Sequence, residues 1–248
     1  MSRKLNLTVC VLLLSLGISN SIHAQANAPA IKHEDLATMP LENVTIEAQS
    51  ITSLFSKLSL AYNIPVGLET AYNDDESVTY HIDFKKGTLR DLLTQFIDQH
   101  DQYSWEIHDG VVNIFPKDNY RDALFRDLLE TKISRYSIKE GTNCLTLAKS
   151  LTDSPEVKKI LEGYGTVYRE RNFSGTLAPQ VGQNFALDVS NVALKTLLNR
   201  VIKESPTAKF WFITRNSYDQ TLFLSFSARS EYLPSKNNSS SDPQSNDQ

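Results

Sequence analysis

A stretch of 18 residues occurs twice in this chain in similar form, and it limits the possible folds more than any other feature. The first copy, YHIDFKKGTLRDLLTQFI, begins at Tyr80, and the second, FALDVSNVALKTLLNRVI, begins at Phe185. Five of the 18 aligned positions are identical, and five more pair similar residues. In both copies a short alternation of apolar and polar residues is followed by apolar residues at helical spacing. Each copy therefore predicts a strand followed by an amphipathic helix.

The residues around the first copy predict further elements, in the order β-α-β-β-α-β-β over residues 44–117. Ser50 is a good N-cap for a helix over 51–62, and Gly87-Thr88 separates a strand from the next helix. Asp109-Gly110 predicts a two-residue hairpin between the last two strands. The expected strands are 44–48, 66–69, 80–84, 103–107 and 111–115, and the expected helices are 51–62 and 89–97.

The second half of the chain predicts a similar order. The expected strands are 133–138, 185–189, 210–213 and 222–226, and the expected helices are 145–151, a short one from Pro155, and 194–202. Residues 164–183 show no clear pattern. We therefore expect an α+β fold with two tandem units, 44–117 and 132–229, and a linker helix within 118–131.

The amino-terminal residues predict export, and the carboxyl-terminal residues predict a disordered tail. Arg3 and Lys4 precede an apolar run from Leu7 to Ile18, and small residues suit cleavage after Ala24 or Ala26. This pattern predicts a cleaved signal peptide over 1–26, a leader over 27–42, and a periplasmic or secreted protein. The tail over 234–248 is rich in Ser, Asn, Asp and Gln, and its composition is typical of disorder.

Charge and cysteine content exclude several classes of partner and chemistry. Removal of the signal takes away two positive charges, so the net charge falls from -4 to about -6, and no basic block remains. We therefore expect neither nucleic acid nor an anionic membrane surface as a partner, and no transmembrane segment in the mature chain. Cys144 would be the only cysteine left, which rules out an internal disulfide and favours a small core residue over a nucleophile.

The remaining polar residues do not form a recognisable catalytic or metal-binding motif. Asp83 and Asp188 hold equivalent places in the two copies and could form a carboxylate pair, but solvent exposure is the better interpretation for each. The histidines lack zinc-site spacing: His33, His81, His100 and His108. We therefore assign no catalytic residue, no cofactor-binding residue and no metal ligand, and we expect no cofactor.

Two stretches of the first unit carry a resemblance to a known family. They are ITSLFSKLSLAYNIPVGLE and VTYHIDFKKGTLRDLLTQFIDQHDQYSWEIHDGVVNIF, with a Thr-Leu-x-x-Leu-Leu helix start at residues 88–93. This pattern resembles the short amino-terminal (STN) domain of secretins and of TonB-dependent signal-transducing receptors, over 44–117 and more weakly over 132–229. The resemblance implies two helices between two small sheets in each unit, and docking onto other envelope proteins. The remaining residues of the sequence match neither a secretin channel domain nor a receptor plug or barrel, so we do not expect the protein to act as the pore or the receptor itself.

The sequence leaves three hypotheses of function open. The first is an exported, non-catalytic protein-interaction module, an accessory of an envelope secretion, transport or signalling complex. It would bind another envelope protein, for which pairing at a strand edge is one route. The alternatives are a periplasmic binding protein for a small molecule or cell-wall fragment, and a hydrolase without a recognisable motif. Neither the interface residues nor the oligomeric state follow from the sequence.

Overall fold

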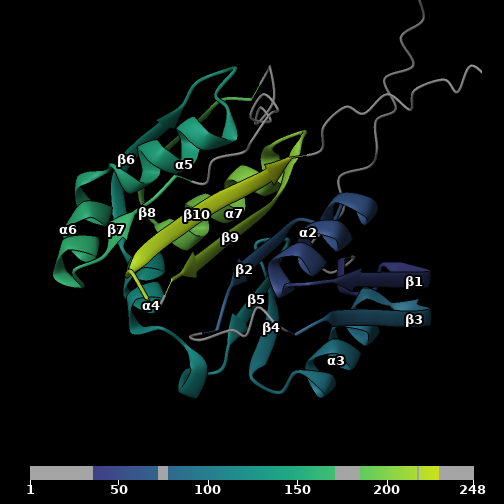
Figure 1. The fold of residues 1–248 in the computed structure, drawn as a ribbon. Helices are drawn as coiled ribbons and strands as arrows, with labels where there is room; N and C mark the ends of the chain where they lie inside the picture. Colours follow the sequence, from purple (N-terminus) through teal and green to yellow (C-terminus); the bar gives the residue numbers. More distant parts are fainter. Residues whose placement is uncertain (1–35, 72–77, 171–184, 217, 229–248) are drawn as a thin grey trace, which may run out of the picture. The chain divides into compact units, whose positions relative to one another are not determined.

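The computed structural model describes residues 36–71, 78–170, 185–216 and 218–228, whose strands form three sheets (Figure 1). The fold is α+β, as the sequence predicts. Two of the sheets have two antiparallel strands each, and the third has six strands. The two-stranded sheets pair β1 (Pro40–Ala48) with β3 (Tyr80–Thr88), and β6 (Lys132–Ile138) with β8 (Leu187–Ala193).

Local signals in the first repeat start its two helices where the sequence predicts. Ser50 accepts a hydrogen bond from the Ser53 backbone N–H at 3.1 Å and caps α2 (Ile51–Tyr62). Thr88 and Asp91 form a capping box at the start of α3 (Leu89–Gln99), which ties two backbone donors to side chains. The remaining strands of this repeat are β2 (Val66–Glu69), β4 (Tyr103–His108) and β5 (Val111–Pro116).

The second repeat has a longer helical part. Pro155 stands in the first turn of α6, where its missing N–H costs nothing. The elements after β6 are α5 (Cys144–Thr152), α6 (Pro155–Gly163), β7 (Val167–Tyr168), β8, α7 (Leu194–Glu204), β9 (Ala208–Arg215) and β10 (Thr221–Ala228).

The segment between the repeats does more than connect them. A short 3-10 turn, Asp118–Tyr120, leads into α4 (Ala123–Glu130), so a helix is present where a linker helix was predicted. Its apolar face is fully buried and packs against α6 and α7. Helix α4 is therefore part of the second core.

The strands of the two halves pair in the same pattern. In each half the outer pair is antiparallel, β1 with β3 and β6 with β8. The closing hairpins also match, β4 with β5 and β9 with β10, and in each half a short strand runs parallel to the last one, β2 beside β5 and β7 beside β10. In both halves a left-handed residue stands between a helix and the short strand: Asn63 is the C-cap of α2, and Gly165 follows Tyr164, the C-cap of α6.

The two repeats nevertheless share one sheet. Its order is β4-β5-β2-β9-β10-β7, so three strands of each repeat lie side by side, and the parallel pair β2 and β9 joins them. The expectation that each unit would hold its own separate sheets is wrong at this point. The physical reason is that β2 and β9 are both open edges of a three-stranded sheet, and pairing them satisfies their backbone groups. We call the β2–β9 pair the joint.

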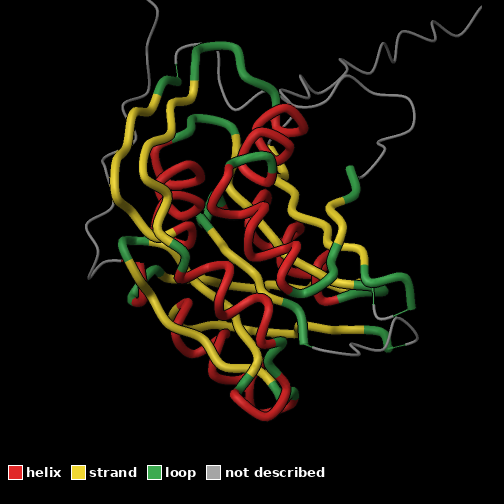
Figure 2. The backbone as a smooth tube through the Cα atoms, turned by 90° about the vertical axis from the view of Figure 1, so that its left-hand side faces the viewer, coloured by secondary structure: helices red, strands yellow, loops and turns green. Residues whose placement is uncertain are grey.

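The two hydrophobic cores lie on opposite faces of the shared sheet. Phe210 and Phe212 of β9 belong to the core of the first repeat, whereas Trp211 and Ile213 of the same strand belong to the core of the second. Accordingly α2 packs against β9 and α7 packs against β2, so each repeat supplies a helix to cover the other's strand. Figure 2 shows helices packed between the layers of strands.

The first repeat begins earlier than the sequence predicts. Leu36 and Leu41 fall in the expected leader, yet both are buried in the first core, and β1 starts at Pro40. The predicted signal peptide over 1–26 and the tail over 234–248 lie outside the described residues.

Candidate interaction edge

Strand β4 forms one end of the six-stranded sheet, and no other described strand lies on its outer side. It pairs with β5 through a two-residue turn at Asp109 and Gly110, both with positive φ. The Lys117 N–H donates to the Gln102 carbonyl at 2.8 Å, so residues 102 and 117 form a hydrogen-bonded pair. In an antiparallel ladder every second pair along the strands is hydrogen-bonded in this way. By alternation, the backbone groups of Trp105 and Ile107 face away from β5. These groups are available to a further strand.

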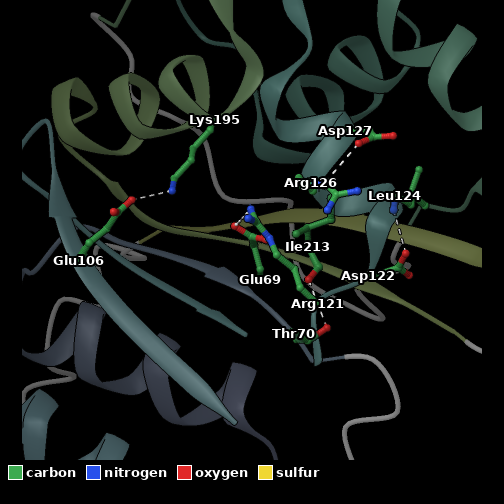
Figure 3. Close-up of polar contacts among 10 residues, drawn as sticks. All are labelled: Glu69, Thr70, Glu106, Arg121, Asp122, Leu124, Arg126, Asp127, Lys195 and Ile213. Carbon is green, nitrogen blue, oxygen red and sulfur yellow. Dashed lines mark hydrogen bonds and ion pairs between the residues drawn. The ribbon is translucent and has the colours of Figure 1, made fainter. Parts of the chain in front are cut away.

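The side chains of β4 present two different faces beside that backbone. Trp105 and Ile107 pack partly against the first core and remain half-buried. The guanidinium of Arg90 lies over the Trp105 ring at 5.9 Å, a cation–π contact. On the other face, Glu106 forms an ion pair with Lys195 at the start of α7, at 2.8 Å (Figure 3). A strand added at β4 would meet an aromatic and aliphatic face on one side and a polar face on the other.

The other end of the sheet is β7, which is much shorter. Val167 and Tyr168 pair with Thr221 and Leu222 of β10, and the Val167 side chain is 65% exposed. Directly after β7, Arg169 is exposed and its guanidinium lies 3.5 Å from the Asp219 carboxylate. This end of the sheet therefore combines a short backbone edge with charge.

The joint depends on a close approach between Gly67 of β2 and Trp211 of β9. A Cβ atom at Gly67 would lie 2.4 Å from the indole ring, so any other residue would clash. The Trp211 ring is held in place because its Nε1–H donates to Asn199 Oδ1 on α7 at 2.9 Å. The joint is thus a specific packing arrangement as well as a backbone ladder.

Two buried ion pairs fasten the connecting segment to the joint. Arg121 donates two hydrogen bonds to the Glu69 carboxylate at the end of β2, at 2.8 and 3.0 Å (Figure 3). The neighbouring Asp122 pairs with Arg215 at the end of β9, at 3.1 Å, and caps α4 by accepting from the Leu124 N–H. Adjacent residues of opposite charge thus contact both strands of the joint.

Burial dominates the electrostatics of Glu69. Its side chain is almost completely buried, and desolvation raises the pKa of the carboxyl above its usual value although Arg121 pulls it down. Both oxygens of the carboxylate accept from one guanidinium, and the side chain is only 2% exposed. We therefore interpret these pairs as structural.

Asp83 and Asp188 are not brought together. Asp83 lies on β3 and Asp188 on β8, which belong to two different sheets. Each is exposed, with Lys85 3.3 Å from Asp83 and Arg135 3.5 Å from Asp188. The structure therefore supports the solvent-exposed interpretation and gives no carboxylate pair.

The histidines are also dispersed. His81 is exposed on β3, His100 packs against the rings of Tyr80 and Phe96, and His108 lies 3.2 Å from Asp109. His33 lies outside the described residues. Across the described ranges, no three residues of the His, Cys, Asp and Glu types gather in a way that could hold a metal ion.

Cys144 is a core residue. Its side chain is buried at the start of α5, and burial raises the pKa of the thiol to about 12. A thiol with that pKa carries almost no thiolate at neutral pH and is a poor nucleophile.

An open hollow beside β1 and α2 does not resemble a site for an apolar small molecule. It has a volume of about 340 Å³ and is lined by Glu47, Ala48, Gln49, Ser53 and Lys57. Ala48 is its single apolar lining residue, whereas small-molecule sites are mostly apolar and enclosed.

Three signals in the sequence could have located the joint and the free edge. Residues 210–213, Phe-Trp-Phe-Ile, form an unbroken apolar run, which is typical of a strand buried on both faces. Residues 103–108 instead alternate apolar and polar, as a strand with one covered face does. The isolated Gly67 within β2 also indicates a close backbone approach.

Comparison of the chain with protein-family models, with curated proteins and with solved structures finds no match. Among the described helices, none is both long and apolar enough to cross a membrane.

Proposed function

We propose that the protein is an exported, non-catalytic interaction module that binds an extended segment of another envelope protein along the β4 edge. The edge geometry carries this proposal. The resemblance of residues 44–117 to the STN domain supports an envelope partner, and the basic-apolar-small order of residues 1–26 supports export. The partner belongs to a secretion, transport or signalling complex.

The shape of the β4 edge supports strand addition over other modes of binding. A row of outward-facing N–H and C=O groups gives affinity to any extended chain, and pockets for alternate side chains give selectivity. Beside Trp105 and Ile107 a partner gains apolar contact, with the Trp105 ring already held under Arg90. A partner segment that alternates apolar and polar residues satisfies both faces of β4.

The joint explains why the first repeat offers this edge and no other in the shared sheet. An isolated three-stranded sheet of the first repeat would expose β2 as well as β4, but β9 occupies the β2 edge in the same chain. Residues 44–117 alone would also lose Phe210 and Phe212 from their core. Binding experiments therefore need the whole chain.

The test compares two substitutions at Ile107. Ile107→Pro removes the outward N–H while sparing the ladder to β5, and Ile107→Ala removes the side chain but keeps the N–H. Each variant is used to capture proteins from its native envelope, and captured proteins are identified by mass spectrometry. We expect the wild-type protein and Ile107→Ala to capture the same partner protein, and we expect Ile107→Pro not to capture it.

A direct measurement completes the test. In the complex with that partner, hydrogen exchange at the Trp105 and Ile107 amides should slow relative to the free protein, because a paired edge is protected. Equal capture by wild type and Ile107→Pro, with unchanged exchange at both amides, would show that β4 is not the binding edge.

A further inference from the structure

The joint is a head-to-tail contact between repeats. It pairs β2 of the first repeat with β9 of the second, and β9 corresponds to β4 because each opens the closing hairpin of its repeat. Each repeat has one edge of the β2 kind and one of the β4 kind. The joint uses β2 of the first repeat and β9 of the second, so one edge of each kind remains at the ends of the sheet. Those ends are β4 and β7, the counterpart of β2. A contact between unlike edges can repeat without limit from copy to copy.

The strand directions are compatible with such repetition. Strand β4 runs antiparallel to β5, and β7 runs parallel to β10, which is antiparallel to β9. Since β5, β2 and β9 are parallel, β4 and β7 point in the same direction. A second copy shifted along the sheet would place its β4 beside β7 in parallel, as β9 stands beside β2 in the joint.

We propose that Arg169 prevents this extension and keeps β7 closed to the β4 edge of a second copy. Tyr168 pairs with β10 as Val66 pairs with β5, and both follow the left-handed residue at the helix end, Gly165 or Asn63, at the same distance. The residue that corresponds to Gly67 is therefore Arg169. The joint requires glycine there, and β7 supplies the largest cationic side chain.

The consequence for a second copy follows from the geometry of the joint. The missing side chain of Gly67 makes room for Trp211, which points into its own core. In a repeated contact, Arg169 would point toward the core side of β4, where Tyr103 is fully buried and Trp105 half-buried. A guanidinium brought there loses hydration, and its exposed ion pair with Asp219, at 3.5 Å, is too loose to compensate for that cost.

The β4 edge also lacks the apolar surface that seals the joint. Strand β9 offers Phe210 and Phe212 to the neighbouring core, whereas the corresponding face of β4 offers Ser104, Glu106 and His108. Charged and polar residues at strand edges are a common protection against edge-to-edge association. Protection against a second copy leaves β4 open to a separate extended chain.

The test measures self-association by sedimentation velocity over a wide range of protein concentration. The variants are Arg169→Gly, which restores the joint's glycine, Arg169→Lys, which keeps a charge, and Arg169→Gly combined with Ile107→Pro, which blocks β4. Arg169 is exposed, so the substitutions should leave folding intact, and circular dichroism with a thermal scan checks this.

We expect monomers for wild type, Arg169→Lys and the double variant, and concentration-dependent association for Arg169→Gly at least about tenfold tighter than any wild-type association. Two results would overturn the proposal. One is a folded Arg169→Gly that stays monomeric throughout the range. The other is wild-type protein that associates and becomes monomeric when Ile107→Pro is introduced.

Discussion

The indole of Trp211 fills the space in which a side chain at residue 67 would stand, and this contact joins the two repeats. A Cβ atom at Gly67 would lie 2.4 Å from the ring, closer than atoms can pack. Because the ring is held between β2 and α7, it cannot move aside without breaking its hydrogen bond to Asn199. Gly67→Ala should therefore lower the free energy of unfolding by about 1–3 kcal/mol, as overpacking does.

Chemical unfolding of Gly67→Ala measures this effect, and Gly163→Ala is the matched control. Gly163 lies at the end of α6, and nothing approaches the position of its Cβ within 4 Å. Alanine there should change stability by less than about 1 kcal/mol, in the stabilising direction. Equal effects of the two substitutions would show that the joint tolerates a side chain at residue 67.

Removing Arg121 should destabilise the protein in a pH-dependent way. Arg121→Ala leaves the Glu69 carboxylate buried without its partner, and such a loss typically costs about 3–5 kcal/mol at neutral pH. Burial already raises the folded-state pKa of Glu69 above its unfolded value. Because the folded-state pKa is the higher one, proton uptake by Glu69 favours the folded state. This contribution to the free energy of unfolding is fully present below the unfolded-state pKa and is lost as pH rises through the folded-state pKa.

The penalty of Arg121→Ala should therefore shrink on acidification, as Glu69 takes up a proton. Urea unfolding of wild type and variant at about pH 5 and about pH 8 measures the difference between the two penalties. The double variant with Glu69→Gln should lose this pH dependence. A penalty that grows as pH falls would contradict the assignment of Glu69 as the buried group that drives it.

The shared sheet should make unfolding a single cooperative event. Leu92 and Leu197 are buried in different cores, and replacing either with alanine should cost about 2–5 kcal/mol. Since the joint couples the cores, each variant should shift the unfolding of both repeats. Hydrogen exchange across a urea series, read at amides of α3 and of α7, reports the two repeats separately and leaves the joint unaltered. Two separated transitions would mean that the joint does not couple them.

Cys144 should be unreactive in the native protein. Burial and a thiol pKa of about 12 both suppress attack on a disulfide reagent at neutral pH. In a chain with Cys10→Ser, labelling at Cys144 should proceed only as fast as the protein unfolds, and denaturant should release it. Rapid labelling without denaturant would show that α5 opens locally.

The sequence predicts the elements of this fold well because their signals are local. Ser50, Thr88 and the Asp109-Gly110 turn act within a few residues of their own position, and each works as expected. The repeat is likewise visible, because similar strands and helices need similar apolar patterns. The sharing of one sheet is different: it depends on which edges meet, and an edge strand and an inner strand can carry related sequences.

The sequence predicts that a strand edge is available for binding, but it does not identify which strand. A small sheet must have edges, but β4 is the first repeat's free edge in the shared sheet because β9 occupies β2. The ion pairs of Glu69 with Arg121 and of Asp122 with Arg215 were missed for the same reason. Their partners lie far apart in the sequence, and single charged residues at strand ends carry no local signal.

The parallel pairing of β2 with β9 has a consequence for the order of events when the chain is made. The Ser59 hydroxyl donates to the Lys209 carbonyl 150 residues later, and the joint closes over a similar separation. A contact of such long range forms late, because the closure entropy of the intervening chain must be overcome first. During synthesis from the amino terminus, the first repeat is complete before β9 exists, so β2 and part of its core remain exposed until β9 is made. For that interval the nascent chain presents an exposed apolar surface of the kind that chaperones bind.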